Sequence, residues 1–232
     1  MTPKKSSFAA VLGERVINNE RMNSTKQGLI NTWQKRGLIS DQRVLEAFRT
    51  IPREQFIPSG SESKAYRDAP LEIGYGQTIS QPFTLLSMVE LLNVEKTDKV
   101  LEIGAGSGYG AAILGQLASQ VYAIEIVSEL VKLAQGNLNQ AKINNVEVIE
   151  WDGSRGYDRE SPYDKVIVSA ACCEIPKALI EQLVEDGIIV APVGDGQSQV
   201  MTKGIKYNEG LKKSYFGNYA FVPLTGKFGQ VN

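Results

Sequence analysis

Gly104, Gly106 and Gly108 stand at alternate positions directly after a short apolar segment, residues 100–103. An alanine- and leucine-rich segment, residues 109–118, follows at once, so the pattern predicts a strand, a glycine turn and a helix. At such a turn the backbone N–H groups and the positive end of the helix lie beside a bound ligand. Glycine leaves the backbone accessible because it carries no side chain. These residues therefore predict a ligand-binding loop.

The spacing of the glycines restricts the ligand. The dinucleotide fingerprint is G-x-G-x-x-G, whereas this chain has G-x-G-x-G. The difference argues against a pyrophosphate site and a nicotinamide oxidoreductase, and favours a smaller, nucleoside-type ligand. Glu125 follows Gly104 by 21 residues, and an acidic side chain at about this separation accepts hydrogen bonds from ribose hydroxyls. A glycine-rich turn with a surface glutamate and no ligand is the alternative interpretation.

Two further stretches contain side chains suited to binding. Residues 74–82 are rich in turn formers and hydroxyls and precede an apolar helix, so Ser80 or Gln81 is expected to be its N-cap, followed by a proline at the first helical position. Alternatively, this loop covers the glycine turn and offers hydroxyls to the ligand. Asp152 and Gly153 follow a predicted strand. The carboxylate of Asp152 is suited to an exocyclic amine, and a simple Asp-Gly turn is the alternative.

The composition also excludes several chemistries. The chain has no histidine, which rules out Ser-His and Cys-His nucleophilic schemes. Its two cysteines, Cys172 and Cys173, are adjacent, so they cannot close a long disulfide loop. They also leave too few ligands for a zinc site. We expect both to be small core or loop residues, and we expect no metal.

Strands and helices are predicted to alternate from residue 98 onward. Strands are expected at residues 99–103, 120–125, 145–150, 164–169 and 187–193, and helices at residues 109–118, 128–142 and 176–186. This order predicts an α/β fold with a doubly wound, mostly parallel sheet. Ligands of such sheets bind at the carboxyl ends of the strands. The residues at those ends are Gly104, Glu125, Asp152 and Ser169. Short segments at residues 199–202, 215–219 and 221–224 predict antiparallel strands at the sheet edge.

The N-terminal part is less regular. Residues 1–39 are expected to be a partly ordered extension with a helix at residues 28–37. Ser40 is the expected N-cap of a second helix that ends at residues 51–52, and Ser128 is the expected N-cap of the helix at residues 128–142.

The overall totals are those of a globular protein in the cytoplasm. The 232 residues are 42% hydrophobic and 22% charged, and the net charge of −1 indicates no nucleic-acid partner. No apolar run approaches the roughly 18 residues that span a bilayer, so no membrane association is expected. The first residues do not resemble a signal peptide.

Several of these stretches together resemble the protein-L-isoaspartate O-methyltransferases. The matching stretches are residues 76–82, 100–109, 152–153, 174–176 and 222–225, and the resemblance extends over roughly residues 40–230. It implies a Rossmann-like S-adenosylmethionine-dependent methyltransferase fold with a helical N-terminal extension and antiparallel C-terminal strands. Residues 40–232 then form a single domain, with a helical cap and active-site loop at 40–97, a cofactor-binding core at 98–194 and C-terminal strands at 195–232. The pair of cysteines departs from the Ala-Pro that is usual in this family.

The resemblance also implies residue roles. Ser80 matches the active-site serine, and the preceding loop matches the part that closes over the methionine moiety of the cofactor. The implied cofactor-binding residues are Gln77, Thr78, Ile79, Gly104, Gly106, Gly108, Glu125, Asp152, Gly153, Thr225 and Gln230. The implied substrate-binding residues are Val222, Pro223 and Leu224, whose backbone is expected to hold an extended peptide. The implied substrates are damaged proteins and peptides that contain isoaspartate (or D-aspartate), and the protein is expected to be a monomer.

This activity is consistent with the absence of histidine. A carboxyl group has a pKa near ~4, so the nucleophile is ionised at neutral pH and needs no general base. Two alternatives remain. A small-molecule O-methyltransferase would share the glycine loop and Glu125, but would not need residues 77–80 or 222–225. A non-catalytic protein that binds S-adenosylmethionine would share the same loop without turnover.

Overall fold

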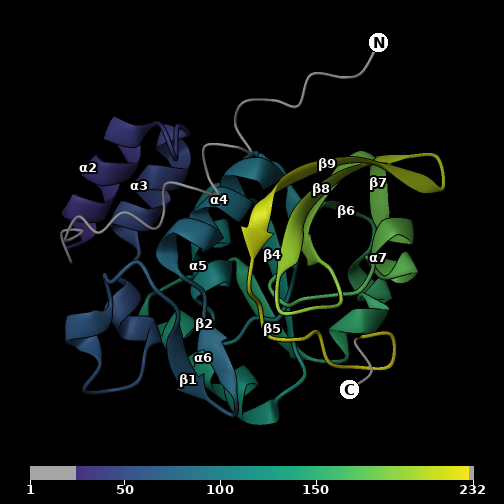
Figure 1. Ribbon diagram of the computed structural model, residues 1–232. Coiled ribbons are helices and arrows are strands. Elements are labelled where there is room, and N and C mark those ends of the chain that lie inside the picture. The colour runs from purple at the N-terminus through teal and green to yellow at the C-terminus, as the bar shows by residue number, and fades with distance from the viewer. Residues whose placement is uncertain (1–24, 230–232) are drawn as a thin grey trace.

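The computed structural model describes residues 25–229, which fold around a central seven-stranded sheet with the order β5-β4-β3-β6-β7-β8-β9 (Figure 1). The strands are β3 (Lys99–Ile103), β4 (Gln120–Glu125), β5 (Val146–Glu150), β6 (Tyr163–Val168), β7 (Leu183–Val193), β8 (Gln199–Tyr207) and β9 (Gly210–Tyr219). The first five run parallel, and β8 and β9 are antiparallel additions beside β7. The predicted doubly wound, mostly parallel sheet with antiparallel C-terminal strands is thus confirmed.

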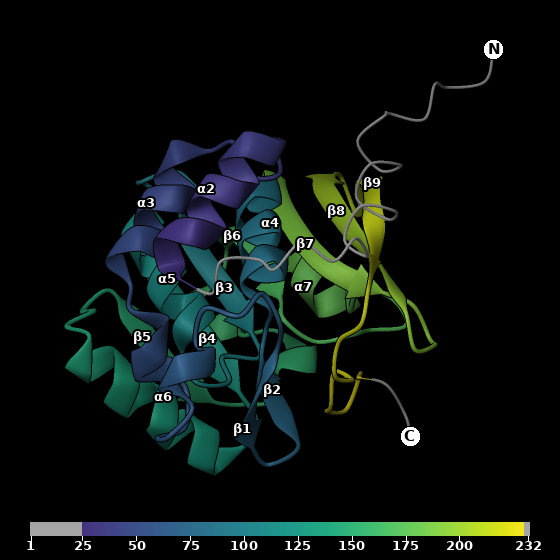
Figure 2. The same ribbon diagram turned by 60° about the vertical axis from the view of Figure 1, so that its left-hand side comes forward.

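Helices cover both faces of this sheet. One face carries α4 (Pro82–Leu92), α5 (Tyr109–Leu117) and α6 (Ser128–Gln140), and α7 (Lys177–Glu181) lies on the other. Successive residues of a strand point to opposite faces. Accordingly, Val100 is buried with α4 and α5, whereas Leu101 is buried with α7. Figures 1 and 2 show the N-terminal helices on the same side of the sheet as α4 and α5.

The N-terminal helices are α2 (Lys26–Arg36) and α3 (Gln42–Thr50), followed by the short 3-10 helices η1 (Arg53–Phe56) and η2 (Glu62–Lys64). Trp33 of α2 is only 1% exposed, and its ring packs against Phe48 of α3 with centroids 5.2 Å apart. The ammonium group of Lys26 donates hydrogen bonds to the carbonyls of Arg49 and Ile51 at the end of α3. Helix α2 is therefore anchored to the core by both apolar and polar contacts.

Two predicted helix caps are wrong, and for a third the structure selects one of the two predicted residues. Asp41, not Ser40, caps α3, and its carboxylate accepts a hydrogen bond from the N–H of Arg43. Val127 is the N-cap of α6, with no side-chain hydrogen bond, and Ser128 is the first helical residue. Gln81 is the N-cap of α4, so Ser80 lies one position before the cap. A cap depends on where the chain turns into the helix, which residue type alone does not determine.

Two predicted boundaries near the C-terminus also shift. The helix expected at residues 176–186 ends at Glu181, and β7 begins at Leu183, which pairs with Tyr163 of β6. Pairing with a neighbouring strand thus overrides the local helical pattern. Residues 221–224 form no strand; they make only an isolated bridge between Ala171 and Pro223.

Two features that would suggest another class of protein are missing from residues 25–229. No helix in this range has the length and apolarity that crossing a membrane requires. The same residues contain no group of three or more histidine, cysteine, aspartate or glutamate side chains placed to hold a metal ion.

Candidate active site

The candidate site lies where the strand order changes direction, between β3 and β6. From β3 the chain continues to β4 and then β5 along one edge of β3, whereas β6 and β7 follow along its other edge. Open α/β sheets bind ligands in the crevice at this switch point. The N–H of Ser169 donates a 2.8 Å hydrogen bond to the carbonyl of Ile103, so the ends of the two strands are joined here.

The glycine loop begins at this point. Gly104, Gly106 and Gly108 have φ angles of 88°, 54° and 86°, a region that side chains disfavour. Gly108 is the N-cap of α5, and a Cβ there would lie 3.2 Å from the Cβ of Ala134 in α6. The loop is therefore made of glycine for both conformational and packing reasons.

Glu125 at the end of β4 holds the glycine loop in place. One carboxylate oxygen accepts a hydrogen bond from the N–H of Gly106 at 2.9 Å. The other accepts from the N–H groups of Ile126 and Val127 at 2.8 and 3.0 Å. Glu125 is 7% exposed and lines a groove of about 60 Å³ that also includes Gly104 and Gly153. Glu125, the residue predicted to bind a ribose, thus lines the groove and also holds its backbone in place.

Glu102 also belongs to this site, although the sequence motifs did not identify it as a functional residue. It is 1% exposed, and its Oε2 atom has no hydrogen-bond partner in the described part of the chain. Burial, together with the nearby charge of Glu125, raises the pKa of Glu102 to about 8. The carboxylate lines a second space of about 40 Å³ with Ser80 and Ser107. An acidic residue inside an otherwise apolar strand was the feature that could have identified it.

The two spaces carry carboxylates and no cationic side chain. Among the described residues that line them, the acidic side chains are Glu125 and Glu102, and neither lysine nor arginine occurs. Such an environment fits a cationic nucleoside such as S-adenosylmethionine, whose sulfonium and ammonium groups are positive. It opposes a pyrophosphate, whose charge would be repelled.

A β-hairpin delivers the predicted loop residues to the same place. Strands β1 (Leu71–Gly74) and β2 (Gln77–Ile79) are joined by Tyr75 and Gly76, which both have positive φ, as tight hairpin turns require. The side chain of Ile73 on β1 lies close to Gly106, with its Cδ1 3.3 Å from where a Cβ would be. Gln77 and Thr78 line the groove beside Glu125, and Ile79 lines the space beside Glu102.

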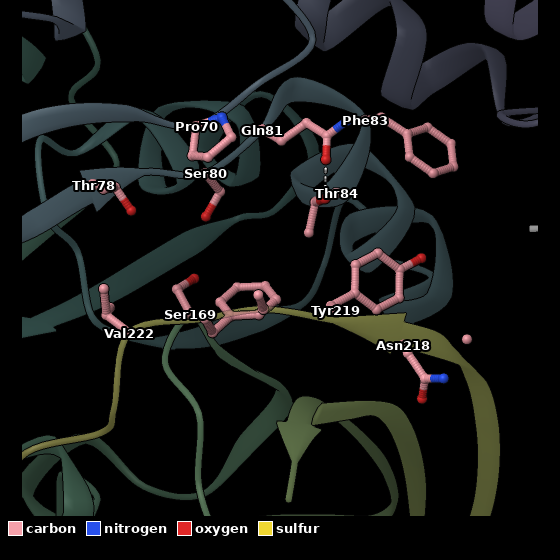
Figure 3. A pocket seen from close by; sticks show the side chains of 13 residues that line it. Pro70, Thr78, Ser80, Gln81, Phe83, Thr84, Ser169, Asn218, Tyr219 and Val222 are labelled. Atoms are coloured by element: carbon pink, nitrogen blue, oxygen red, sulfur yellow. Dashed lines mark hydrogen bonds between the residues drawn. The ribbon is translucent and has the colours of Figure 1, made fainter. Parts of the chain in front are cut away.

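Next to these spaces lies a larger cavity of about 340 Å³ (Figure 3). The side chains of Thr78 and Ser80 point into it from the hairpin side, opposite Ser169 and Val222. Its other lining residues are Pro70, Gln81, Phe83, Thr84, Gly217, Asn218, Tyr219, Ala220 and Phe221. Thr78 and Ser169 line this cavity and both smaller spaces, so the three meet at hydroxyl groups.

The predicted substrate segment crosses the boundary between the cavity and the groove. Val222 lines both, whereas Pro223, Leu224 and Thr225 line only the groove beside Glu125. The carbonyl of Val222 accepts from the N–H of Ala171 at 2.8 Å, and the N–H of Leu224 donates to the carbonyl of Ala171 at 2.7 Å. These two backbone groups are used within the fold, which differs from the expectation that they hold a peptide.

Asp152 also has a different environment from the one expected. Its Oδ1 accepts hydrogen bonds from the N–H and hydroxyl of Ser154, and its Oδ2 accepts from the N–H of Lys227 at 2.8 Å. The hydroxyl of Ser154 accepts from the N–H of Phe228 at 2.9 Å. The carboxylate therefore holds the C-terminal segment, while the adjacent Gly153 lines the groove. Gln230 lies outside the described residues.

The two cysteines stand just after β6, at the edge of the site. Cys172 is buried, and burial raises the pKa of its thiol to about 12. Its N–H donates to the carbonyl of Pro192 at 3.1 Å, while Cys173 is exposed. A thiol with a raised pKa is a poor nucleophile at neutral pH, in keeping with the structural role expected for Cys172.

Comparison with known sequences agrees with this geometry. A sequence model of the protein-L-isoaspartate(D-aspartate) O-methyltransferase family matches residues 23–229. A protein-L-isoaspartate O-methyltransferase of Methanoculleus marisnigri is 46% identical over 191 residues, covering 82% of this chain and 87% of the relative. Protein-L-isoaspartate O-methyltransferase 2 of Archaeoglobus fulgidus is 44% identical over 191 residues, covering 81% of this chain and 87% of the relative.

Solved structures give the same result. A protein-L-isoaspartate O-methyltransferase structure aligns with a TM-score of 0.81 at 28% identity, covering 88% of this chain and 67% of the other. A Plasmodium falciparum protein described as a putative member of the same enzyme class, in complex with S-adenosyl-L-homocysteine, aligns with a TM-score of 0.76 at 25% identity, covering 88% and 99%. The chain, with its glycine loop, acidic groove and hydroxyl-lined cavity, belongs to the protein-L-isoaspartate(D-aspartate) O-methyltransferase family.

Proposed function

We propose that this protein transfers a methyl group from S-adenosyl-L-methionine to the free carboxylate of L-isoaspartyl residues in damaged proteins and peptides. The products are the methyl ester and S-adenosyl-L-homocysteine. The observation that carries the proposal is the junction of an acidic, cation-free groove with a larger uncharged cavity at Thr78 and Ser169. A cationic donor on one side and an anionic acceptor on the other would meet there.

The residues around the groove have distinct tasks in this proposal. The glycine loop and Glu125 hold the nucleoside part of the cofactor, and Gly153 and Thr225 border it. Gln77, Thr78 and Ile79 enclose the methionine part, next to the carboxylate of Glu102. When bound, the cofactor supplies a methyl group on a positively charged sulfur.

Ser80 is the residue proposed to act on the acceptor. Its hydroxyl points into the large cavity and is not used as a helix cap, so it can donate a hydrogen bond to the substrate carboxylate (Figure 3). Hydroxyl donors orient a carboxylate without a full positive charge beside it. A cation there would stabilise the nucleophile before reaction and repel the sulfonium.

No proton transfer is needed in this scheme, which suits a chain without histidine. The carboxylate is ionised at neutral pH, and its charge and that of the sulfonium cancel as the bond forms. Catalysis then rests on holding the two groups in line. Such positioning supplies on the order of 7–11 kcal/mol in well-oriented intramolecular reactions.

The proposal extends to the protein's partners and location. The partners are isoaspartyl-containing proteins and peptides, and the net charge of −1 offers no general attraction for nucleic acid or anionic membranes. We further propose that the protein acts in the cytoplasm as a monomer. Sedimentation velocity of the purified chain tests the monomer, since a dimer would sediment distinctly faster.

The activity is tested with two synthetic peptides that differ only in isoaspartate against normal aspartate. Labelled methyl from S-adenosylmethionine should appear on the isoaspartyl peptide alone. Label on neither peptide, with cofactor binding retained in a thermal-shift assay, would contradict the proposed substrate. A small-molecule methyltransferase or a non-catalytic cofactor-binding protein would then be the better description.

A further inference from the structure

Helix α4, which begins directly after the active-site loop, lacks a side-chain cap of its own. Its N-cap Gln81 makes no capping hydrogen bond, and Pro82 has no N–H. The first N–H that needs a partner is that of Phe83. It donates a 2.9 Å hydrogen bond to Oδ1 of Asp68, which lies in the loop before the hairpin. The cap of α4 is therefore supplied from the far side of the β1–β2 hairpin.

Asp68 is held in this position by two further contacts. Its carbonyl accepts a 2.9 Å hydrogen bond from the side-chain amide of Gln81. Its Oδ2 accepts a 3.4 Å hydrogen bond from the indole N–H of Trp33 in α2. The amide oxygen of Gln81 in turn accepts from the hydroxyl of Thr84 at 3.0 Å. One aspartate thus connects the N-terminal helix, the active-site loop and the first turn of α4.

The side chains connected in this way form one wall of the large cavity. Gln81, Phe83 and Thr84 line it together with Ser80 (Figure 3). The ring of Trp33 packs behind Phe83, with centroids 6.4 Å apart. Burial raises the pKa of Asp68, while the hydrogen bonds from Phe83 and Trp33 and, to a smaller extent, the charge of Arg53 favour the ionised form. A negative charge at a helix N-terminus is favourable.

We propose that Asp68, oriented by Trp33, is a positioning residue that sets the place of Ser80 and of the cavity wall for the substrate. The proposal rests on the proposed function, because it concerns how the same cavity receives the isoaspartyl peptide. It assigns α2 a role in activity in addition to its place in the core. Asp68 does not touch the reacting atoms in this scheme; it acts through the start of α4.

The test compares Asp68→Ala with Asp68→Asn and with Asp41→Ala as a matched control. Asp41 also caps a helix, α3, where it is the N-cap residue itself and accepts from the N–H of Arg43 at 2.8 Å. It forms an ion pair with the side chain of Arg43 and does not line the cavity. All variants are assayed at a temperature where circular dichroism shows each to be folded. We expect Asp68→Ala to lose at least tenfold in kcat/KM, mainly through a higher KM for the isoaspartyl peptide. The Kd for S-adenosylmethionine should stay within about twofold of wild type.

The conservative variant separates positioning from general stability. The amide oxygen of Asp68→Asn still accepts from the N–H of Phe83, whereas its NH2 group cannot accept from the indole N–H of Trp33. The variant should therefore recover part of the lost kcat/KM. Asp41→Ala should stay within twofold of wild type. Equal kcat/KM in Asp68→Ala and Asp41→Ala, or a loss explained wholly by cofactor affinity, would overturn the proposal.

A second measurement does not depend on turnover. Hydrogen exchange of the Phe83 amide should be at least tenfold faster in Asp68→Ala than in wild type, and that of Arg43 should be unchanged. Unchanged exchange at Phe83 would overturn the proposed cap. If wild type itself fails to methylate the isoaspartyl peptide, the proposed function fails, while the exchange experiment still decides whether Asp68 holds α4.

Discussion

Gly110 in the first turn of α5 leaves the space that the carboxylate of Glu102 occupies. A Cβ at this position would overlap with Oε1 of Glu102 and lie 3.5 Å from Cδ1 of Leu85. Alanine normally favours a helix over glycine by about 1 kcal/mol. Here it would displace a buried carboxylate from the wall of the active site.

Gly110→Ala should therefore destabilise the protein, in contrast to Gly136→Ala in α6. Nothing lies within 4 Å of a Cβ at Gly136, so that substitution should be neutral or stabilising by up to about 1 kcal/mol. Overpacking a buried site costs about 1–3 kcal/mol, which is the expected loss for Gly110→Ala. Urea unfolding of both variants measures the difference. Equal stability of the two variants would show that Glu102 moves aside without cost.

Glu102 should make stability depend on pH. Its pKa is about 8 in the folded protein, against an ordinary value of 4.5. Between these pH values the folded state binds more protons than the unfolded state, so stability falls as pH rises from about 4.5 to about 8. The loss is on the order of a few kcal/mol for a shift of this size.

Glu102→Gln removes this titration while keeping the shape of the side chain. The free energy of unfolding, measured in urea at pH 5 and pH 8.5, should fall less steeply in the variant than in wild type. The variant should gain relative to wild type at the higher pH. Parallel pH profiles for the two proteins would mean that Glu102 stays ionised, or is solvated, in the folded state.

Ser80→Ala should reduce activity without reducing stability. The lost hydrogen bond to an ionised carboxylate is worth about 1.5–3 kcal/mol, so kcat/KM should fall roughly 10- to 150-fold. Ser80 is not the cap of α4, and the free energy of unfolding should change by less than about 0.5 kcal/mol. Ser63→Ala, on an exposed 3-10 turn, is the matched control. Wild-type kcat/KM in Ser80→Ala would refute the catalytic role.

Asp152→Ala should loosen the C-terminal segment beside the cofactor groove. The N–H of Lys227 loses its acceptor, and the hydroxyl of Ser154 loses the partner that orients it toward Phe228. Amide exchange at residues 227 and 228 should accelerate about tenfold, and the Kd for S-adenosylmethionine should rise several-fold because Leu224 and Thr225 line the groove. Ser154→Ala should loosen only Phe228 and serve as the graded control. Unchanged exchange at Lys227 would exclude this role for Asp152.

Local sequence predicted most of the parallel core. The predicted bounds of β3 to β6 and of helices α5 and α6 agree with the observed bounds within two residues. Each of these segments carries a clear apolar pattern within its own residues. The helix expected up to residue 186 ended at Glu181 instead. Leu183 pairs with Tyr163, a partner 20 residues away that no local pattern reveals.

The site shows the same division. Alternating glycines, an acidic residue after the next strand and the absence of histidine determined the class of ligand and of chemistry, because these depend on residue type and spacing. Only the tertiary structure decided that the carboxylate of Asp152 binds the C-terminal segment and that Glu102 lies beside Ser80. Likewise, the N-cap of α4 is Gln81, one of the two predicted residues, but the capping hydrogen bond comes from Asp68. Hydrogen bonds and burial of this kind depend on distances between segments that the chain brings together only when it folds.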